Sequence, residues 1–152
     1  MNIIIAGSRR LTDYNKLKIN CLNSITKLHN IFVFNFADIV IISGKCKKGA
    51  DTLGESFAHD MNFPVLPFQA EWRNLKPIDE DGHKLPCFVA YANNGTAYNK
   101  IAGLNRNTKM AKHCAVKISA LIAFWDYKST GTKHMIEQAK IYNIYTIIID
   151  IR

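Results

Sequence analysis

The sequence predicts an α/β protein with a doubly wound, mostly parallel sheet, built as a single domain over residues 1–152. Short runs of β-branched and aromatic residues alternate with segments whose apolar residues recur at helical spacing. Short segments rich in glycine, serine and asparagine follow several of these runs. In an open parallel sheet such segments emerge at the same edge, where ligands bind. A length of 152 residues suits one domain with a sizeable core.

Strands are predicted where the apolar runs are short and are followed by glycine or a polar residue. The predicted strands cover residues 2–6, 39–43, 64–68, 120–125 and 145–149. The third run contains Pro64 and Pro67, which indicates an edge position or an irregular end.

Helices are predicted between these strands. Thr12 or Asp13 can cap the first, in which Leu17, Cys21, Ile25 and Leu28 share a face. The second begins at Ala50, the third near Lys100 and the fourth after Gly131-Thr132. Residues 31–36 either begin a strand or connect the first helix to the second strand.

An insertion at about residues 74–98 interrupts the alternation, with Pro77, Gly82, Pro86 and Gly95 and an acidic stretch at residues 79–81. Long loops of this kind are usually functional lids or disordered segments. We refer to residues 74–98 as the flap.

Composition narrows the class of protein. The net charge of +8 favours anionic partners, although scattered lysines also serve solubility. No apolar run approaches the roughly 20 residues of a membrane-spanning helix, and the first residues do not resemble a signal peptide. The four cysteines form no metal-binding pattern. We therefore expect a cytoplasmic protein with free thiols, no bound metal, no cofactor and no membrane contact.

The polar segments after the strands predict a crevice that binds phosphate. Glycines let the backbone approach an anion, helix N-termini add positive potential, and arginine pairs with phosphate. Asp51 either caps a helix or contacts a ribose hydroxyl, and Trp72 either stacks on a base or packs. The predicted nucleotide-binding residues are Gly7, Ser8, Arg9, Ser43, Gly44, Lys45, Gly49, Asp51, Trp72, Arg106, Asn107, Asp126, Ser129, Thr130, Gly131 and Thr132.

In this order, these residues resemble the SLOG superfamily, in its YspA-like branch, which is common in bacteria and phages. The resemblance rests on the segments 7–9, 43–51, 100–110 and 126–136 and on Trp72 after the third strand, and it spans nearly the whole chain except the flap. It implies a Rossmann-like fold that binds its ligand at the carboxyl edge of the sheet. Superfamily members include lonely-guy phosphoribohydrolases, DNA-processing protein A relatives and defence proteins that bind NAD-derived signalling nucleotides.

The enzymes of the superfamily share the motif Pro-Gly-Gly-x-Gly-Thr-x-x-Glu. Here Gly131-Thr132 is kept, but Met135 stands where the glutamate is expected. Glu137 is two residues away, which on a helix is a rotation of about 200°. Glu71 and Glu137 are therefore weak candidates for a catalytic carboxylate, and we expect no enzymatic activity.

The favoured function is binding of a phosphorylated nucleoside, or of a nucleotide derived from NAD or ADP-ribose, with a role in defence or anti-defence signalling. The alternatives are hydrolysis of an N-glycosidic bond and binding of single-stranded nucleic acid. We expect a small nucleotide ligand and a homo-oligomer.

Overall fold

The computed structural model describes residues 1–152 and contains a five-stranded sheet in the order β3–β2–β1–β6–β7, in which all neighbouring strands are parallel. The strands are β1 (Asn2–Gly7), β2 (Val40–Ser43), β3 (Val65–Pro67), β6 (Ser119–Trp125) and β7 (Tyr145–Asp150). The predicted fold class is confirmed, and each predicted strand end lies within one residue of the observed one.

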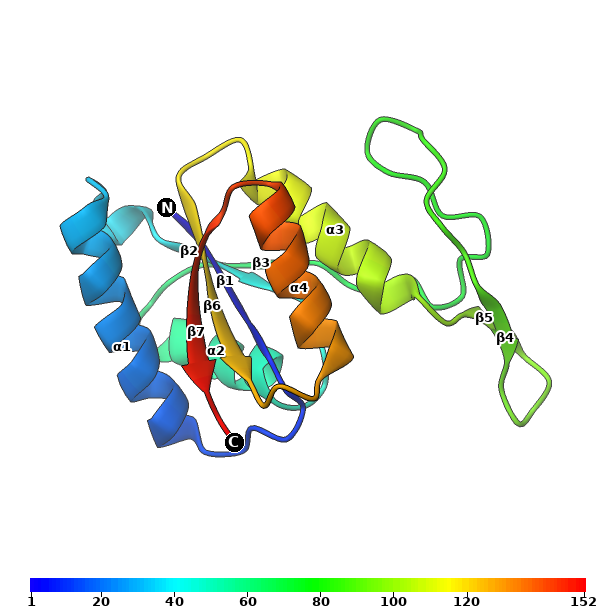
Figure 1. The fold of residues 1–152 in the computed structure, drawn as a ribbon, viewed down its shortest axis with the longest axis horizontal. Coiled ribbons are helices and arrows are strands. Elements are labelled where there is room, and N and C mark those ends of the chain that lie inside the picture. Colours follow the sequence, from blue (N-terminus) through cyan, green and yellow to red (C-terminus); the bar gives the residue numbers. More distant parts are fainter.

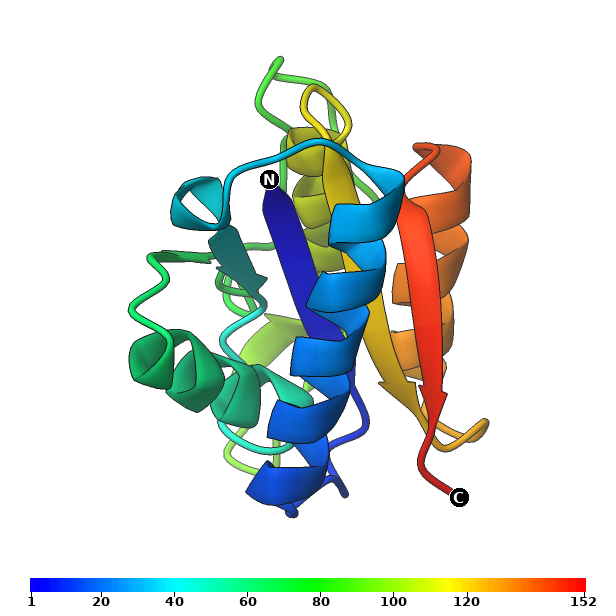
Figure 2. The same cartoon turned by 90° about the vertical axis from the view of Figure 1, so that its left-hand side faces the viewer.

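Helices cover both faces of the sheet (Figures 1 and 2). They are α1 (Tyr14–Ile31), α2 (Ala50–Asp60), α3 (Ala102–Cys114) and α4 (Thr130–Ile141). Asp13 caps α1, because its Oδ1 accepts the Lys16 N–H at 2.9 Å. Residues 32–35 form a connection, not a strand, and a short 3₁₀ helix, η1 (Phe36–Asp38), follows. No helix is long and apolar enough to cross a membrane.

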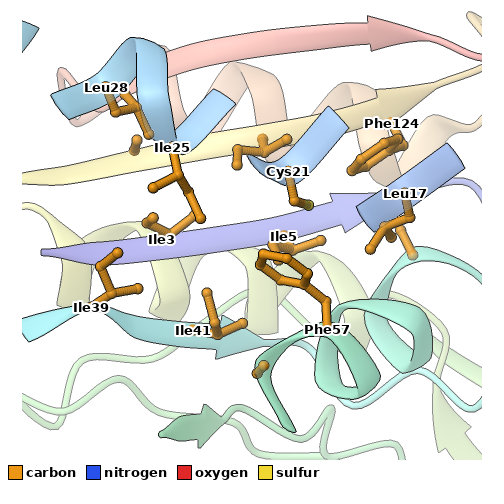
Figure 3. Close-up of a cluster of buried hydrophobic side chains, with 14 of the residues drawn as sticks. Ile3, Ile5, Leu17, Cys21, Ile25, Leu28, Ile39, Ile41, Phe57 and Phe124 are labelled. Atoms are coloured by element: carbon orange, nitrogen blue, oxygen red, sulfur yellow. The ribbon is translucent and has the colours of Figure 1, made fainter. Parts of the chain in front are cut away.

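The central strand β1 separates two hydrophobic cores because its side chains alternate between the two faces. Ile3 and Ile5 face α1 and α2, and Figure 3 shows them against side chains of both helices. Ile4 and Ala6 face α3 and α4. All four side chains are buried, and full burial of one isoleucine side chain contributes about 1.5–3 kcal/mol. This packing fixes the carboxyl end of β1 in the middle of the edge that carries the polar loops.

The strand order reverses at β1. From β1 the chain moves outward through β2 to β3, and then crosses back to place β6 on the other side of β1. Since α1 and α4 cover opposite faces, the loops after β1 and β6 diverge there. Such a topological switch point is where open α/β sheets bind ligands.

The flap contains structure that the sequence analysis does not predict. An antiparallel hairpin joins β4 (Val89–Tyr91) to β5 (Ala97–Asn99), and a bridge pairs Ile78 with Lys84. Figure 1 shows the flap projecting from the body beyond the start of α3. Asn94-Gly95, with Gly95 at φ +79°, is a sequence favoured in hairpin turns. This pair of residues could have predicted the hairpin.

Candidate functional site

The loops after β1 and β2 touch at the carboxyl edge because glycines permit it. A Cβ on Gly7 would lie 2.8 Å from Cβ of Phe124 and 2.9 Å from Cβ of Ala50. Gly49 has φ +78° and lies directly against the backbone of Ser8 and Arg9. Larger residues at these two positions would push the loops apart. The glycines therefore hold the two loops together at the centre of the edge.

A hydrogen bond joins the loops after β1 and β6 across the switch point. Ser8 Oγ donates to Asp126 Oδ2 at 2.9 Å, while Asp126 Oδ1 accepts the backbone N–H of Ser129 at 2.7 Å and of Lys128 at 3.0 Å. These hydrogen bonds lower the pKa of Asp126, and the bond from the Ser129 N–H has the largest effect. The Asp126 carboxyl group is therefore ionised at neutral pH. Asp126 thus acts as a brace between two loops.

The start of α4 is capped and open to solvent. Ser129 Oγ accepts the Thr132 hydroxyl at 2.9 Å and the Thr132 N–H at 3.4 Å. The N–H groups of Thr130 and Gly131 have no intrahelical partners at this position. A Cβ on Gly131 would meet nothing within 4 Å. The helix start therefore offers free donors and space for an anion.

A buried ion pair connects α3 to the loop after β2. Arg106 Nη1 lies 3.5 Å from Asp51 Oδ2 and also donates to the carbonyl oxygen of Gly44. Asp51 Oδ2 accepts the Cys46 N–H at 3.0 Å. Burial raises the pKa of Asp51 and lowers that of Arg106, in each case against the attraction of the partner. Asp51 therefore braces the loop, whereas the sequence analysis offers a cap or a ribose contact.

Asn107 links α3 to the start of α4. Its Nδ2 donates to the carbonyl oxygen of Gly131 at 3.0 Å and lies 3.5 Å from Nδ1 of His134. Arg106 Nε donates to Asn107 Oδ1 at 3.0 Å, so the two residues form one chain of contacts from β2 to α4. Both lie inside α3.

Glu55 is a carboxylate at this edge that the sequence analysis misses. It accepts the Ser43 hydroxyl, and its Oε2 lies 2.9 Å from Nζ of Lys45. Glu55 follows Asp51 by four residues on α2, so the two carboxylates share a face. That spacing could have identified Glu55 once the start of the helix was known.

Glu71 and Glu137, the two weak candidates for a catalytic carboxylate, lie beside lysine side chains. Glu71 pairs with Lys109 at 3.0 Å, and the hydrogen bond from Asn74 chiefly lowers its pKa. Glu137 is exposed and lies 3.9 Å from Lys133. Met135, which replaces the glutamate of the enzyme motif, is buried in the core between the sheet and α3 and α4.

Two hollows flank the edge. The first, at the foot of the flap, has a free volume of about 10 Å³ and includes Asn99, Asn105 and Arg106 in its lining. The second, at the switch point, is an open hollow of about 580 Å³. Its charged lining residues are Arg10, Asp13, Lys16, Asp126, Lys128 and Arg152. The basic residues of this second hollow are absent from the predicted site because nothing in their spacing singles them out.

The predicted residues fall into two groups in the structure. The hydroxyls of Ser8, Ser43 and Thr132 are buried and bonded within the chain. By contrast, Arg9, Lys45, Thr130 and Gly131 are exposed. Trp72 is 42% exposed, and its ring edge lies 3.4 Å from where a Cβ on Gly103 would be.

Comparison with protein families gives a match over the first 75 residues. Residues 1–75 match the model of the YspA, cpYpsA-related SLOG family. This segment runs from β1 to the loop after β3 and includes the loops around Ser8 and Gly49. Searches of curated proteins and of solved structures found no match to this chain.

Proposed function

The chain belongs to the YspA, cpYpsA-related SLOG family, and from this premise we propose that its carboxyl edge binds a phosphorylated nucleoside or a nucleotide derived from NAD or ADP-ribose. The observation that carries the proposal is the joining of loops at the switch point. Gly49 lies against the backbone of Ser8 and Arg9, and Ser8 is bonded to Asp126. Loops from three strand ends therefore meet at one place on the edge.

The phosphate is held by exposed donors on both sides of that place. The Arg9 side chain is exposed and forms no ion pair within the chain, so it can pair with a phosphate oxygen. The free N–H groups at the start of α4 supply further donors. Lys45, beside Glu55, adds a cation from the loop after β2.

Calorimetry with ADP-ribose, cyclic ADP-ribose isomers and AMP tests the proposal. Substituting Arg9→Ala removes a charge-assisted pair worth roughly 1.5–3 kcal/mol, so affinity should fall about ten- to hundredfold. Lys27→Ala is the control, because Lys27 is exposed on α1 and near the end of that helix remote from the edge. Failure of every nucleotide to bind the wild-type protein would refute the proposal.

Hydrolysis of an N-glycosidic bond is a second candidate, favoured by the position of Glu55. A carboxylate can stabilise an oxocarbenium-like transition state, and Glu55 lies at the edge on the ordered helix α2. Release of adenine from AMP by the wild-type protein, abolished by Glu55→Gln, would establish this activity. Binding without turnover would leave nucleotide recognition as the function.

A further inference from the structure

A buried donor at the foot of the flap has no partner in the chain. Asn99, the last residue of β5, is fully buried, and its Nδ2 makes no hydrogen bond. A buried donor without an acceptor is costly, so such a group points to a molecule that supplies one. Asn2 Nδ2 is also unpaired, but Asn2 begins β1 at the opposite end and lines neither hollow.

The orientation of the Asn99 amide is fixed by its neighbours. Its Oδ1 accepts the backbone N–H of Phe88 at 3.1 Å and of Ile101 at 3.2 Å. A reversed amide would turn Nδ2 toward these two donors, which cannot accept a hydrogen bond from it. Nδ2 is therefore the free atom.

The hollow next to Asn99 is polar and small. Its polar lining consists of Gln69, Glu71, Asn99, Asn105, Arg106 and Lys109. Asn105 Nδ2 donates to the carbonyl oxygen of Pro86 at 2.7 Å, while its Oδ1 has no partner in the chain. A free volume of about 10 Å³ is about the space that one water molecule needs, so a single polar atom of a ligand can enter it but a ring cannot. The hollow thus offers the Asn99 donor and the Asn105 acceptor to a ligand.

Arg106 connects this hollow to the proposed phosphate crevice. It lines the hollow and also contacts Gly44 and Asp51 in the loop after β2. Trp72 lies at the foot of the flap, because its carbonyl oxygen accepts the Asn99 N–H at 2.7 Å and its ring lies near Gly103. Arg106 is therefore common to the foot of the flap and the loop after β2.

We propose that the foot of the flap is the subsite for the nucleobase, in which Asn99 Nδ2 donates to a ring nitrogen or carbonyl oxygen of the base. This inference rests on the proposed function. The base lies at the mouth of the hollow beside the exposed ring of Trp72, and only its polar edge enters. Asn105 Oδ1 accepts a hydrogen bond from an adjacent N–H of the base. The ligand is accordingly a nucleotide rather than a sugar phosphate.

The test compares AMP with ribose 5-phosphate, which has the phosphate and the sugar but no base. Asn99→Asp keeps an oxygen for the N–H groups of Phe88 and Ile101 and removes the free donor. We expect calorimetry to show AMP affinity reduced about tenfold and ribose 5-phosphate affinity unchanged. Asn94→Asp is the control, because Asn94 Oδ1 also accepts a backbone N–H, from Thr96 at 3.0 Å, in the exposed hairpin turn.

The outcomes separate the two proposals. If the wild-type protein binds neither of these compounds, and also fails to bind ADP-ribose and its cyclic isomers, the proposed function fails, and the subsite fails with it. If it binds both and Asn99→Asp changes both affinities equally, or neither, the subsite alone is refuted. Nuclear magnetic resonance of the wild-type protein gives a check that does not depend on folding of the variant. The Asn99 side-chain amide signals should shift with AMP and stay unchanged with ribose 5-phosphate.

Discussion

The guanidinium of Arg106 lies 3.5 Å from the carboxylate of Asp51, and the two side chains are only 17% and 9% exposed. Arg106 comes from α3 and Asp51 from the first turn of α2. Since these helices cover opposite faces of the sheet, the pair clamps the two layers together over the end of β2. A buried charge without a partner strongly destabilises the folded state.

Removing one partner of this pair should therefore destabilise the fold strongly. We expect Arg106→Gln and Asp51→Asn each to lower the free energy of unfolding by about 3–5 kcal/mol. The double variant should lose clearly less than the sum, because neither charge is then left unpaired. Urea unfolding measures all three. The exposed pair Lys133–Glu137 is the control, and its neutralisation should change stability by less than about 0.5 kcal/mol.

His134 should make stability depend on pH. Burial lowers the pKa of His134 below its ordinary value of 6.5, and its Nδ1 faces Nδ2 of Asn107 at 3.5 Å. The folded pKa is depressed, so the unfolded chain takes up the proton more readily. The stabilisation is therefore complete above pH 6.5 and is lost as the pH falls through the folded value. Thermal unfolding between pH 7.5 and about 5 should show a steeper fall in Tm for the wild-type protein than for His134→Gln. If the Tm of the two proteins falls equally with pH, His134 is excluded as the cause of the pH dependence.

The cysteines should divide into two reactive and two inert thiols. Burial raises the pKa of Cys21 to about 12 and that of Cys114 to about 11, whereas Cys46 is partly exposed and Cys87 exposed. A thiol reagent should therefore label only Cys46 and Cys87 in the native protein. Cys46 lies in the loop that we assign to phosphate binding, so a bound nucleotide should slow its labelling. Cys87, in the flap, provides an internal reference, and equal slowing at both positions would argue against direct protection.

The sequence predicts the sheet well and the site less well, for physical reasons. Residues 3–5 are three successive isoleucines that are buried within β1, so local pattern and tertiary burial agree. A serine after a strand, however, suits both a ligand and an internal brace. Only tertiary packing shows that the Ser8 hydroxyl belongs to Asp126. Glu55 and Asn99 are missed because their roles depend on the phase of a helix and on the burial of the flap root.

The expected homo-oligomer also stays a prediction, and the flap bears on it. Phe88 is 57% and Tyr91 72% exposed on the projecting hairpin. Sedimentation of the wild-type protein and of Tyr91→Ser would test whether association involves this arm. Loss of association in the variant would assign the contact to the hairpin, while a monomeric wild-type protein would contradict the prediction.

Gly131 offers a test in which stability and binding move in opposite directions. It lies in the first turn of α4, and a Cβ there would meet nothing within 4 Å. Gly131→Ala should leave the free energy of unfolding unchanged or raise it by up to about 1 kcal/mol, because alanine favours the helix. The same methyl group occupies the space where we place the phosphate, so nucleotide affinity should fall. Lys133→Ala is the control, because Lys133 lies in the same turn and its side chain is exposed. This variant should leave the nucleotide affinity nearly unchanged. Unimpaired nucleotide binding by Gly131→Ala would show that the ligand does not approach the start of α4.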